Sequence, residues 1–200
     1  MKTVARSYHQ TARAEAAEAT GRRIIDAFLA RLMEEWFDEI TLDAVAEDAG
    51  VTVQTVIRRF GGKEGLLGGA VKVMGTQIET QRASPPGEID RLVENLIADY
   101  EKTGDAVLRL LALEARHPAV KAVVDFGRGE HRRWVSAAFA QELGRLEPAE
   151  RQHALDALVI VTDVYTWKLL RRDMGRSGRA TAAAMKNLIE GTITKFTRTT

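Results

Sequence analysis

Apolar residues recur at intervals of three and four along almost the whole of this 200-residue chain, and only four prolines interrupt them. This spacing places the apolar side chains on one face of an α-helix. The pattern therefore predicts an all-α protein. The chain is long enough for one domain or two small ones, with a buried core.

Composition excludes several classes of protein. Cysteine is absent, which excludes disulfides, zinc fingers, iron–sulfur clusters and thiol nucleophiles and is compatible with the cytoplasm. No run of about 18 apolar residues is present, so we expect no membrane-spanning segment. The first 20 residues lack the apolar centre of a secretory signal. We therefore expect a cytoplasmic protein that has no membrane partner.

Positive charge is concentrated in two short segments, although the net charge is only +1. Met1 to Ala14 contains Lys2, Arg6 and Arg13 and no acid, and Val51 to Lys63 contains three further cations and no acid. The rest of the chain is therefore acidic overall. A basic patch on an acidic protein is the electrostatic pattern expected of a nucleic-acid contact.

Four helices are expected before residue 83, with a polar arm ahead of the first. Threonine before an apolar run can accept a hydrogen bond from the first helical turn, and glycine after it can end the helix. The last of the four is long enough to connect two domains, and the Ala-Ser-Pro-Pro-Gly segment at 83–87 is the clearest break in the chain. The expected helices run from Thr20 to about Trp36, from Thr41 to Gly50, from Thr52 to Gly61 and from Lys63 to about Arg82.

Five more helices are expected beyond this break. Proline suits the first turn of two of them. Gly127 and Gly129 predict a kink in the third. The expected ranges are Glu88 to Thr103, Asp105 to His117, Pro118 to about Leu143, Pro148 to Arg172, and Arg179 to about Arg198.

The second and third helices have the features of a helix-turn-helix, in which two helices cross at a tight turn. Ala46 and Ala49 are small where the helices must approach each other, and Gly50 can adopt a left-handed conformation at the turn. The apolar contacts expected to fix the crossing come from Val45, Val51, Val56 and Phe60.

The stretch from Thr41 to Gly68 resembles the DNA-binding domain of the TetR family of transcriptional regulators. The resemblance implies an arm and helix-turn-helix domain at residues 1–68 and a helical effector-binding and dimerisation domain at residues 69–200. It also implies a regulator that is not an enzyme and has no cofactor: a homodimeric repressor that binds a palindromic double-stranded operator and is released by a small-molecule effector. The matching residues are Thr41, Ala49-Gly50-Val51-Thr52, Val56, Phe60, Lys63 and Leu66, with a weaker match from Thr162 to Gly175.

Two positions depart from the family's pattern. Ile57 stands where the family commonly has a tyrosine that bonds a DNA phosphate, and Arg59 stands where histidine or tyrosine is common. We expect Arg59 to replace the missing phosphate contact.

The face of the third helix that meets DNA follows from about 100° of rotation per residue. With Val56 at the centre of the buried side, Phe60 and Val53 lie within about 60° of it. Gln54 and Arg58 lie roughly opposite, and their side chains can pair with adenine and guanine edges respectively. Residues at helix starts can hold phosphates. The predicted DNA-contacting residues are Thr41, Thr52, Gln54, Thr55, Arg58, Arg59 and Lys63.

For the second domain, aromatic or polar side chains on apolar helices are candidates for an effector pocket. The apolar final two helices are expected to pair with their copies in a four-helix dimer interface. The predicted pocket residues are Tyr100, His117, Phe126, Trp134 and Trp167. The predicted interface residues are Leu155, Leu158, Val159, Leu169, Met185, Leu188, Ile189 and Phe196.

Two other functions are considered. The pairs Glu114/His117 and Glu150/His153 have the Glu-x-x-His spacing of a di-iron carboxylate oxidoreductase, although both fall at helix ends and not in the middle of a bundle. Because of that placement we favour a protein without a metal. The remaining alternative is a helical scaffold with a vestigial helix-turn-helix.

Overall fold

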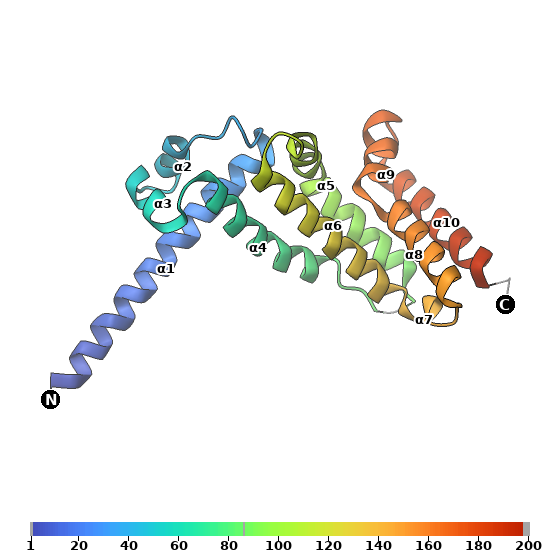
Figure 1. Cartoon of the computed structure of the whole chain (residues 1–200), viewed down its shortest axis with the longest axis horizontal. Coiled ribbons are helices and arrows are strands. Elements are labelled where there is room, and N and C mark those ends of the chain that lie inside the picture. Colours follow the sequence, from blue (N-terminus) through green and yellow to red (C-terminus); the bar gives the residue numbers. More distant parts are fainter. Residues whose placement is uncertain (1, 86, 198–200) are drawn as a thin grey trace. The chain divides into compact units, whose positions relative to one another are not determined.

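A computed structural model describes residues 2–85 and 87–197 of the chain, and the side chains of residues 14–85 and 87–196. Every regular element in these ranges is helical, which confirms the all-α fold (Figure 1). None of the described helices is long and apolar enough to cross a lipid bilayer.

The chain forms two compact units, Met1–Met74 and Gly75–Thr200, which we call unit 1 and unit 2. The division falls inside helix α4 (Lys63–Gln81), so a single helix belongs to both units. The domain boundary predicted after residue 68 falls in the same helix. No regular element is present in the described part of the break, and Pro86 lies outside the described residues.

Unit 1 is built on α1 (Lys2–Glu34), which is longer than predicted. Thr20 does not cap a helix, because the helix runs through it and its hydroxyl donates to the carbonyl of Ala16 at 2.9 Å. The predicted polar arm is therefore helical from Lys2. Trp36 lies beyond the helix end and is 40% exposed, and Phe37 is buried in its place. Helices α2 (Leu42–Asp48) and α3 (Val53–Phe60) follow.

Unit 2 surrounds a core in which Leu96, Leu158, Trp167, Met185 and Ile189 are almost completely buried. Its helices pack side by side, with α10 against both α5 and α8 (Figure 1). The elements are α5 (Ile89–Leu113), α6 (Pro118–Ala138), α7 (Ala140–Leu143), α8 (Pro148–Thr162), α9 (Val164–Lys168), a π-helix η1 (Leu169–Asp173) and α10 (Gly178–Thr197).

The break predicted near Gly104 is wrong, because α5 is one continuous helix from Ile89 to Leu113. Gly104 is buried, and a Cβ atom there would lie 2.5 Å from Cζ3 of the Trp167 ring. This glycine therefore makes room for a tryptophan from α9 and does not end a helix.

Two other predicted boundaries are also wrong. The helix from Pro118 continues through Gly127 and Gly129 and ends at Ala138, because Phe139 leaves the helical conformation. The long helix from Pro148 is interrupted at Asp163, whose extended backbone and side chain cap α9 through the amide of Tyr165 at 2.8 Å. The predicted end of the last helix at Arg198 lies outside the described residues.

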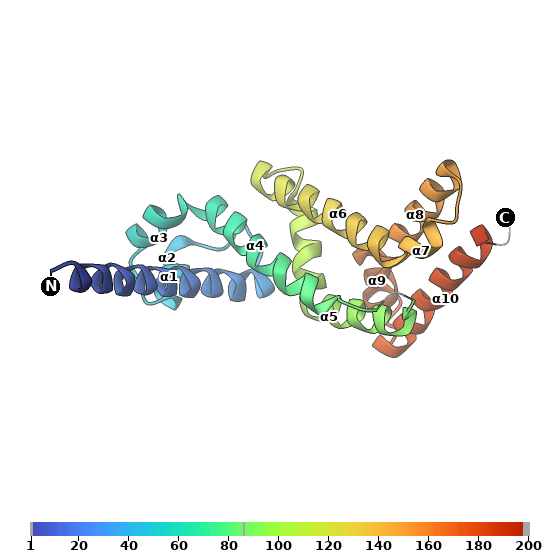
Figure 2. The ribbon, with the colours of Figure 1, turned by 90° about the horizontal axis from the view of Figure 1, so that it is seen from below.

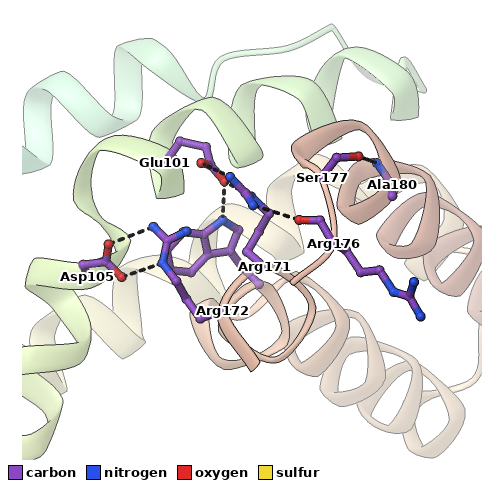
Figure 3. A network of polar contacts seen from close by, with 8 residues as sticks. Glu101, Asp105, Arg171, Arg172, Arg176, Ser177 and Ala180 are labelled. Carbon is purple, nitrogen blue, oxygen red and sulfur yellow. Dashed lines mark hydrogen bonds and ion pairs between the residues drawn. The ribbon is translucent and has the colours of Figure 1, made fainter. Parts of the chain in front are cut away.

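The π-helix η1 presents two consecutive arginines to carboxylates one turn apart on α5 (Figure 3). Arg171 pairs with both oxygens of Glu101 at 2.6 and 2.8 Å, and Arg172 pairs with both oxygens of Asp105 at 3.0 and 2.8 Å. Glu101 also accepts from the Trp167 indole at 3.0 Å. The arginines hold the pKa of each carboxyl below its usual value. These contacts fasten η1 and α9 to α5.

Candidate nucleic-acid interface

Helices α2 and α3 are delimited by the residues that the sequence singles out. The Thr41 hydroxyl accepts from the amide of Ala44 at 3.2 Å, and the Thr52 hydroxyl accepts from the amide of Thr55 at 3.3 Å. Gly50 turns the chain between the helices with a φ of 62°. Because both caps satisfy amides that lack a partner in the helix, each helix begins at a defined residue.

The two helices are fixed against each other and against α1. Val45 and Val56 are fully buried, and Ala46 and Ala49 are nearly so, which allows the helices to approach closely. Arg23 of α1 donates to the carbonyl of Ala49 at 3.3 Å, so α1 holds the turn directly.

The burial pattern of α3 matches the expected faces. Val56 has no exposed surface and Val53 and Phe60 are half-buried, whereas Gln54 and Arg58 on the other side are exposed. Ile57 is 40% exposed. Exposed side chains with donor and acceptor groups therefore occupy the outer face of a short, rigidly capped helix, as direct reading of base edges requires.

Arg59 has a neighbour that sequence reasoning missed. Its guanidinium lies over Gly21 of α1, where an added Cβ would fall 2.5 Å from Nε of the arginine. Because the guanidinium is the far end of an exposed, flexible side chain, a larger residue at position 21 would displace the arginine and would not separate α1 from α3. The signal in the sequence is an isolated glycine within a helical pattern, which often marks close packing.

Lys63 has a structural role that was also not predicted. Its ammonium donates to the carbonyls of Asp38 and Ile40 at 3.1 and 3.0 Å and lies 4.8 Å from the centre of the Phe37 ring. The side chain at the start of α4 thus holds the loop between α1 and α2. This loop leads directly to the cap at Thr41.

Residues 24–70 match the family model described as bacterial regulatory proteins, tetR family. The chain carries a TetR-family helix-turn-helix domain. The match covers the apolar part of α1, all of α2 and α3, and the start of α4. No curated protein sequence matches the chain.

Solved structures share the TetR-like fold over most of the chain. A tetR-family transcriptional regulator from Streptomyces coelicolor is 19% identical with a TM-score of 0.69, covering 88% of this chain and 79% of that one. Salmonella enterica GusR is 18% identical with a TM-score of 0.67, covering 88% and 95%. A transcriptional regulator from Rhodococcus sp. Rha1 is 14% identical with a TM-score of 0.68, covering 87% and 96%. At these identities the likeness shows the fold.

In the second unit of this TetR-like chain, two of the five predicted pocket residues lie against Arg82, and a third contacts one of these two. Its guanidinium carbon is 4.9 Å from the centre of the Tyr100 ring and 5.4 Å from the Trp134 ring. Tyr100 also contacts Trp167, with ring centres 5.9 Å apart. Trp167 is fully buried and Tyr100 is 4% exposed, so both are packed within the core.

Arg82 belongs to a polar network that the sequence did not reveal. It donates to Asp99 Oδ2 from Nε at 2.7 Å, and its Nη1 lies 3.3 Å from His131 Nδ1. His131 Nε2 lies 3.1 Å from the Thr162 hydroxyl, and Tyr100 donates to the Thr162 carbonyl at 2.9 Å. Burial, and next the Arg82 cation, lower the pKa of His131 to about 4. Burial raises the pKa of Tyr100.

The other two predicted pocket residues are not part of this network. His117 is half-buried at the start of α6, before Pro118. Phe126 is 51% exposed on α6. The structure therefore does not bring the five residues into one site.

The Glu-x-x-His pairs do not form the di-iron site considered above. Both carboxylate oxygens of Glu114 pair with Arg128, at 2.7 and 2.8 Å, and His153 is exposed on α8. Among the side chains that the structure describes, no three of the metal-ligating types gather closely enough to hold an ion.

The predicted interface residues divide into two groups, so part of that prediction is wrong. Leu158, Met185 and Ile189 are buried in the core of unit 2, and Leu155, Val159 and Phe196 pack against that core. Leu169 and Leu188 are about half exposed. The sequence analysis missed Ile160 and Tyr165, which are 65% and 54% exposed. Periodicity alone could not decide which apolar side of each helix faces the core.

Proposed function

We propose that the chain is a transcriptional repressor that binds a palindromic operator as a homodimer in the cytoplasm and is released by a small-molecule effector. The observation that carries the proposal is the outer face of α3, where Gln54 and Arg58 are exposed directly opposite the buried Val56. The surrounding segment from Val51 to Lys63 is basic and contains no acid, which suits a polyanion.

In this proposal the exposed residues of α3 read bases and the residues at helix starts bind phosphates. Gln54 and Arg58 would each pair with a base edge in the major groove. Thr41, Thr52 and Thr55 lie at the first turns of α2 and α3, where hydroxyls and amides can bind a phosphate. The exposed Arg59 would add a phosphate contact, and Lys63 would do so only with the donor left over from its bonds to the carbonyls of Asp38 and Ile40.

The proposed homodimer uses the exposed apolar side chains of α8 and α10. Ile160 and Leu188 expose large aliphatic side chains on two helices that pack together. Exposed apolar side chains that form a contiguous patch commonly mark an interaction site. A two-fold dimer would present two copies of α3, as a palindromic operator requires.

The proposed effector binds in unit 2 near Arg82, Tyr100 and Trp134. The Arg82 guanidinium is 8% exposed and bonded to Asp99, so the effector would have to displace one of these partners to reach the charge and the two aromatic rings. Because Arg82 directly follows the last residue of α4, an effector that displaces it would also change the end of the helix that unit 1 shares. Release of DNA would then follow from a shift between two conformations that differ in effector affinity.

The test is selection of duplexes from a random-sequence pool by the purified protein. We expect an enriched inverted repeat, and we expect Arg58→Ala to weaken binding to it by about 1–3 kcal/mol and relax the preference at one position in each half. Arg116→Ala removes an exposed cation from unit 2 and should leave binding unchanged. Absence of any enriched sequence would favour the scaffold with a vestigial helix-turn-helix.

A further inference from the structure

Helix α3 exposes an isoleucine among polar side chains. Ile57 is 40% exposed, and the other exposed residues of this helix are Gln54, Arg58 and Arg59. The helix lies beside α1 in both views (Figures 1 and 2). Single exposed apolar residues are common on protein surfaces, so exposure alone assigns no role to Ile57. Its position on the helix is more informative.

Ile57 lies on the face of α3 that is proposed to read bases. At about 100° per residue, Gln54 is roughly 60° from Ile57, and Arg58 is about 40° further round the helix. The three exposed side chains therefore form one continuous arc of about 100°. Arg59, whose guanidinium lies over Gly21 of α1, is about 160° from Ile57. Ile57 is therefore on the flank of α3 that faces away from α1.

An aliphatic side chain in this arc can meet one apolar group in the major groove of DNA. Thymine presents its C5-methyl group there, whereas the other three bases present hydrogen-bonding groups. Ile57 is branched at Cβ, so its methyl groups have few rotamers in a helix and lose little entropy on contact. Gln54 lies three residues earlier, about 4.5 Å along the helix axis, which is close to one base-pair step.

We propose that Ile57 is a specificity-determining residue, which packs against the C5-methyl group of a thymine beside the base pair that Gln54 reads. This inference rests on the proposed operator-binding function and adds a preference that no hydrogen bond supplies. The segment from Val51 to Lys63 has three cations and no acid, so its charge favours the approach of α3 to DNA. A protein partner fits less well, because one aliphatic side chain beside Gln54 and Arg58 is not a contiguous apolar patch.

The test replaces thymine by deoxyuridine in the operator selected from the random-sequence pool, one position at a time in both halves. Uracil lacks only the methyl group and keeps the hydrogen-bonding groups of thymine, so the replacement isolates the apolar contact. The affinity of each operator is measured for the wild type, Ile57→Ala, Ile57→Val and Val73→Ala. Val73 is the matched control, because it is an aliphatic residue of unit 1 that is 37% exposed and lies on α4.

At one thymine in each half, we expect the wild type and Val73→Ala to lose affinity by about fourfold per methyl group, or about 16-fold for a dimer on the symmetric operator. Ile57→Ala should bind the thymine and uracil operators equally. Ile57→Val keeps two methyl groups on Cβ and should retain most of the loss. Because each comparison is between two operators with the same protein, an effect of the substitution on folding cancels.

Equal losses for the wild type and Ile57→Ala at every thymine would overturn the inference, since the methyl group would then act through the DNA or through another side chain. An operator without thymine in its halves, or with no loss in either protein, would also overturn it, and the proposed sequence-specific function would stand. If no operator is enriched from the pool, the proposed function itself fails and the inference fails with it.

Discussion

Arg82 and Asp99 form an ion pair inside unit 2, with Nε and Nη2 of the arginine 2.7 and 2.5 Å from the same carboxylate oxygen. Asp99 is 1% exposed and Arg82 is 8% exposed, so removal of one partner leaves a charge without compensation in the interior. We expect Asp99→Asn to lower the free energy of unfolding of unit 2 by about 3–5 kcal/mol.

The double variant Arg82→Met with Asp99→Leu should be less destabilised than Arg82→Met alone or Asp99→Leu alone, because it leaves no buried charge unpaired. Urea unfolding of the wild type, the two single variants and the double variant measures the coupling energy between the two side chains. Additive losses in the double variant would contradict a direct interaction between the two charges.

The stability of unit 2 should depend on His131 in mildly acidic solution. Its pKa is about 4 in the folded protein, below the ordinary value of 6.5, so the unfolded chain binds the proton first as pH falls. The contribution of neutral His131 is therefore complete above about pH 6.5 and declines towards pH 4, by about 2–3 kcal/mol in all. We expect the free energy of unfolding, measured with urea between these two pH values, to decline less for His131→Gln than for the wild type. If the free energies of the two proteins fall in parallel with pH, the prediction is contradicted.

Gly104→Ala should destabilise unit 2 by about 1–3 kcal/mol, because the added methyl group would collide with the buried Trp167 ring. Gly127→Ala is the matched control, since no atom lies within 4 Å of its added Cβ and alanine favours the helix. This control should be stabilised by about 0.5–1 kcal/mol. Thermal unfolding of both variants checks the contrast. Equal effects at the two positions would mean that Trp167 does not require the glycine.

Lys63→Ala should destabilise unit 1, whereas Arg58→Ala should not. The Lys63 ammonium holds two carbonyls of the loop before α2, and its loss should cost about 1–3 kcal/mol. The exposed Arg58 makes no such contribution to folding in this structure. Differential scanning calorimetry separates these effects from DNA binding. Identical melting temperatures for Lys63→Ala and the wild type would show that its contacts are dispensable.

Ile160→Glu combined with Leu188→Glu should convert the proposed dimer into a monomer, because each adds a charge to an exposed apolar side chain of α8 or α10. Phe126→Glu is the control, as Phe126 is exposed to a similar extent but lies on α6. Sedimentation velocity distinguishes the species. If the Phe126 variant is a monomer and the double variant is still a dimer, the interface does not lie on α8 and α10.

The helix-turn-helix was predictable because its determinants are local. The caps at Thr41 and Thr52 each act over three residues, and the outer position of Arg58 follows from the rotation per residue around Val56. These signals need no knowledge of the rest of the chain.

Unit 2 was less predictable because its determinants are distant in sequence. Whether Gly104 ends a helix depends on Trp167 from another element, and the Arg82–Asp99 pair forms only when the chain has folded back. The extended conformation at Asp163 interrupts a run of apolar residues that has continuous helical spacing. Helical spacing identifies an apolar stripe, but the neighbour that covers it is a property of the tertiary structure.

The glycines of helix α4 differ in what surrounds them. Gly65 is required, since an added Cβ atom would lie 1.6 Å from the Phe60 carbonyl oxygen, whereas at Gly69 it would meet the end of the Ile25 side chain at 2.8 Å. Gly75, the first residue of unit 2, has no such neighbour and costs its helix about 1 kcal/mol relative to alanine. Gly75 is therefore a poor helix former at a position where packing does not require glycine. In the proposed response to an effector, the extent to which α4 stays helical at Gly75 would count as well as any movement of the helix as a whole.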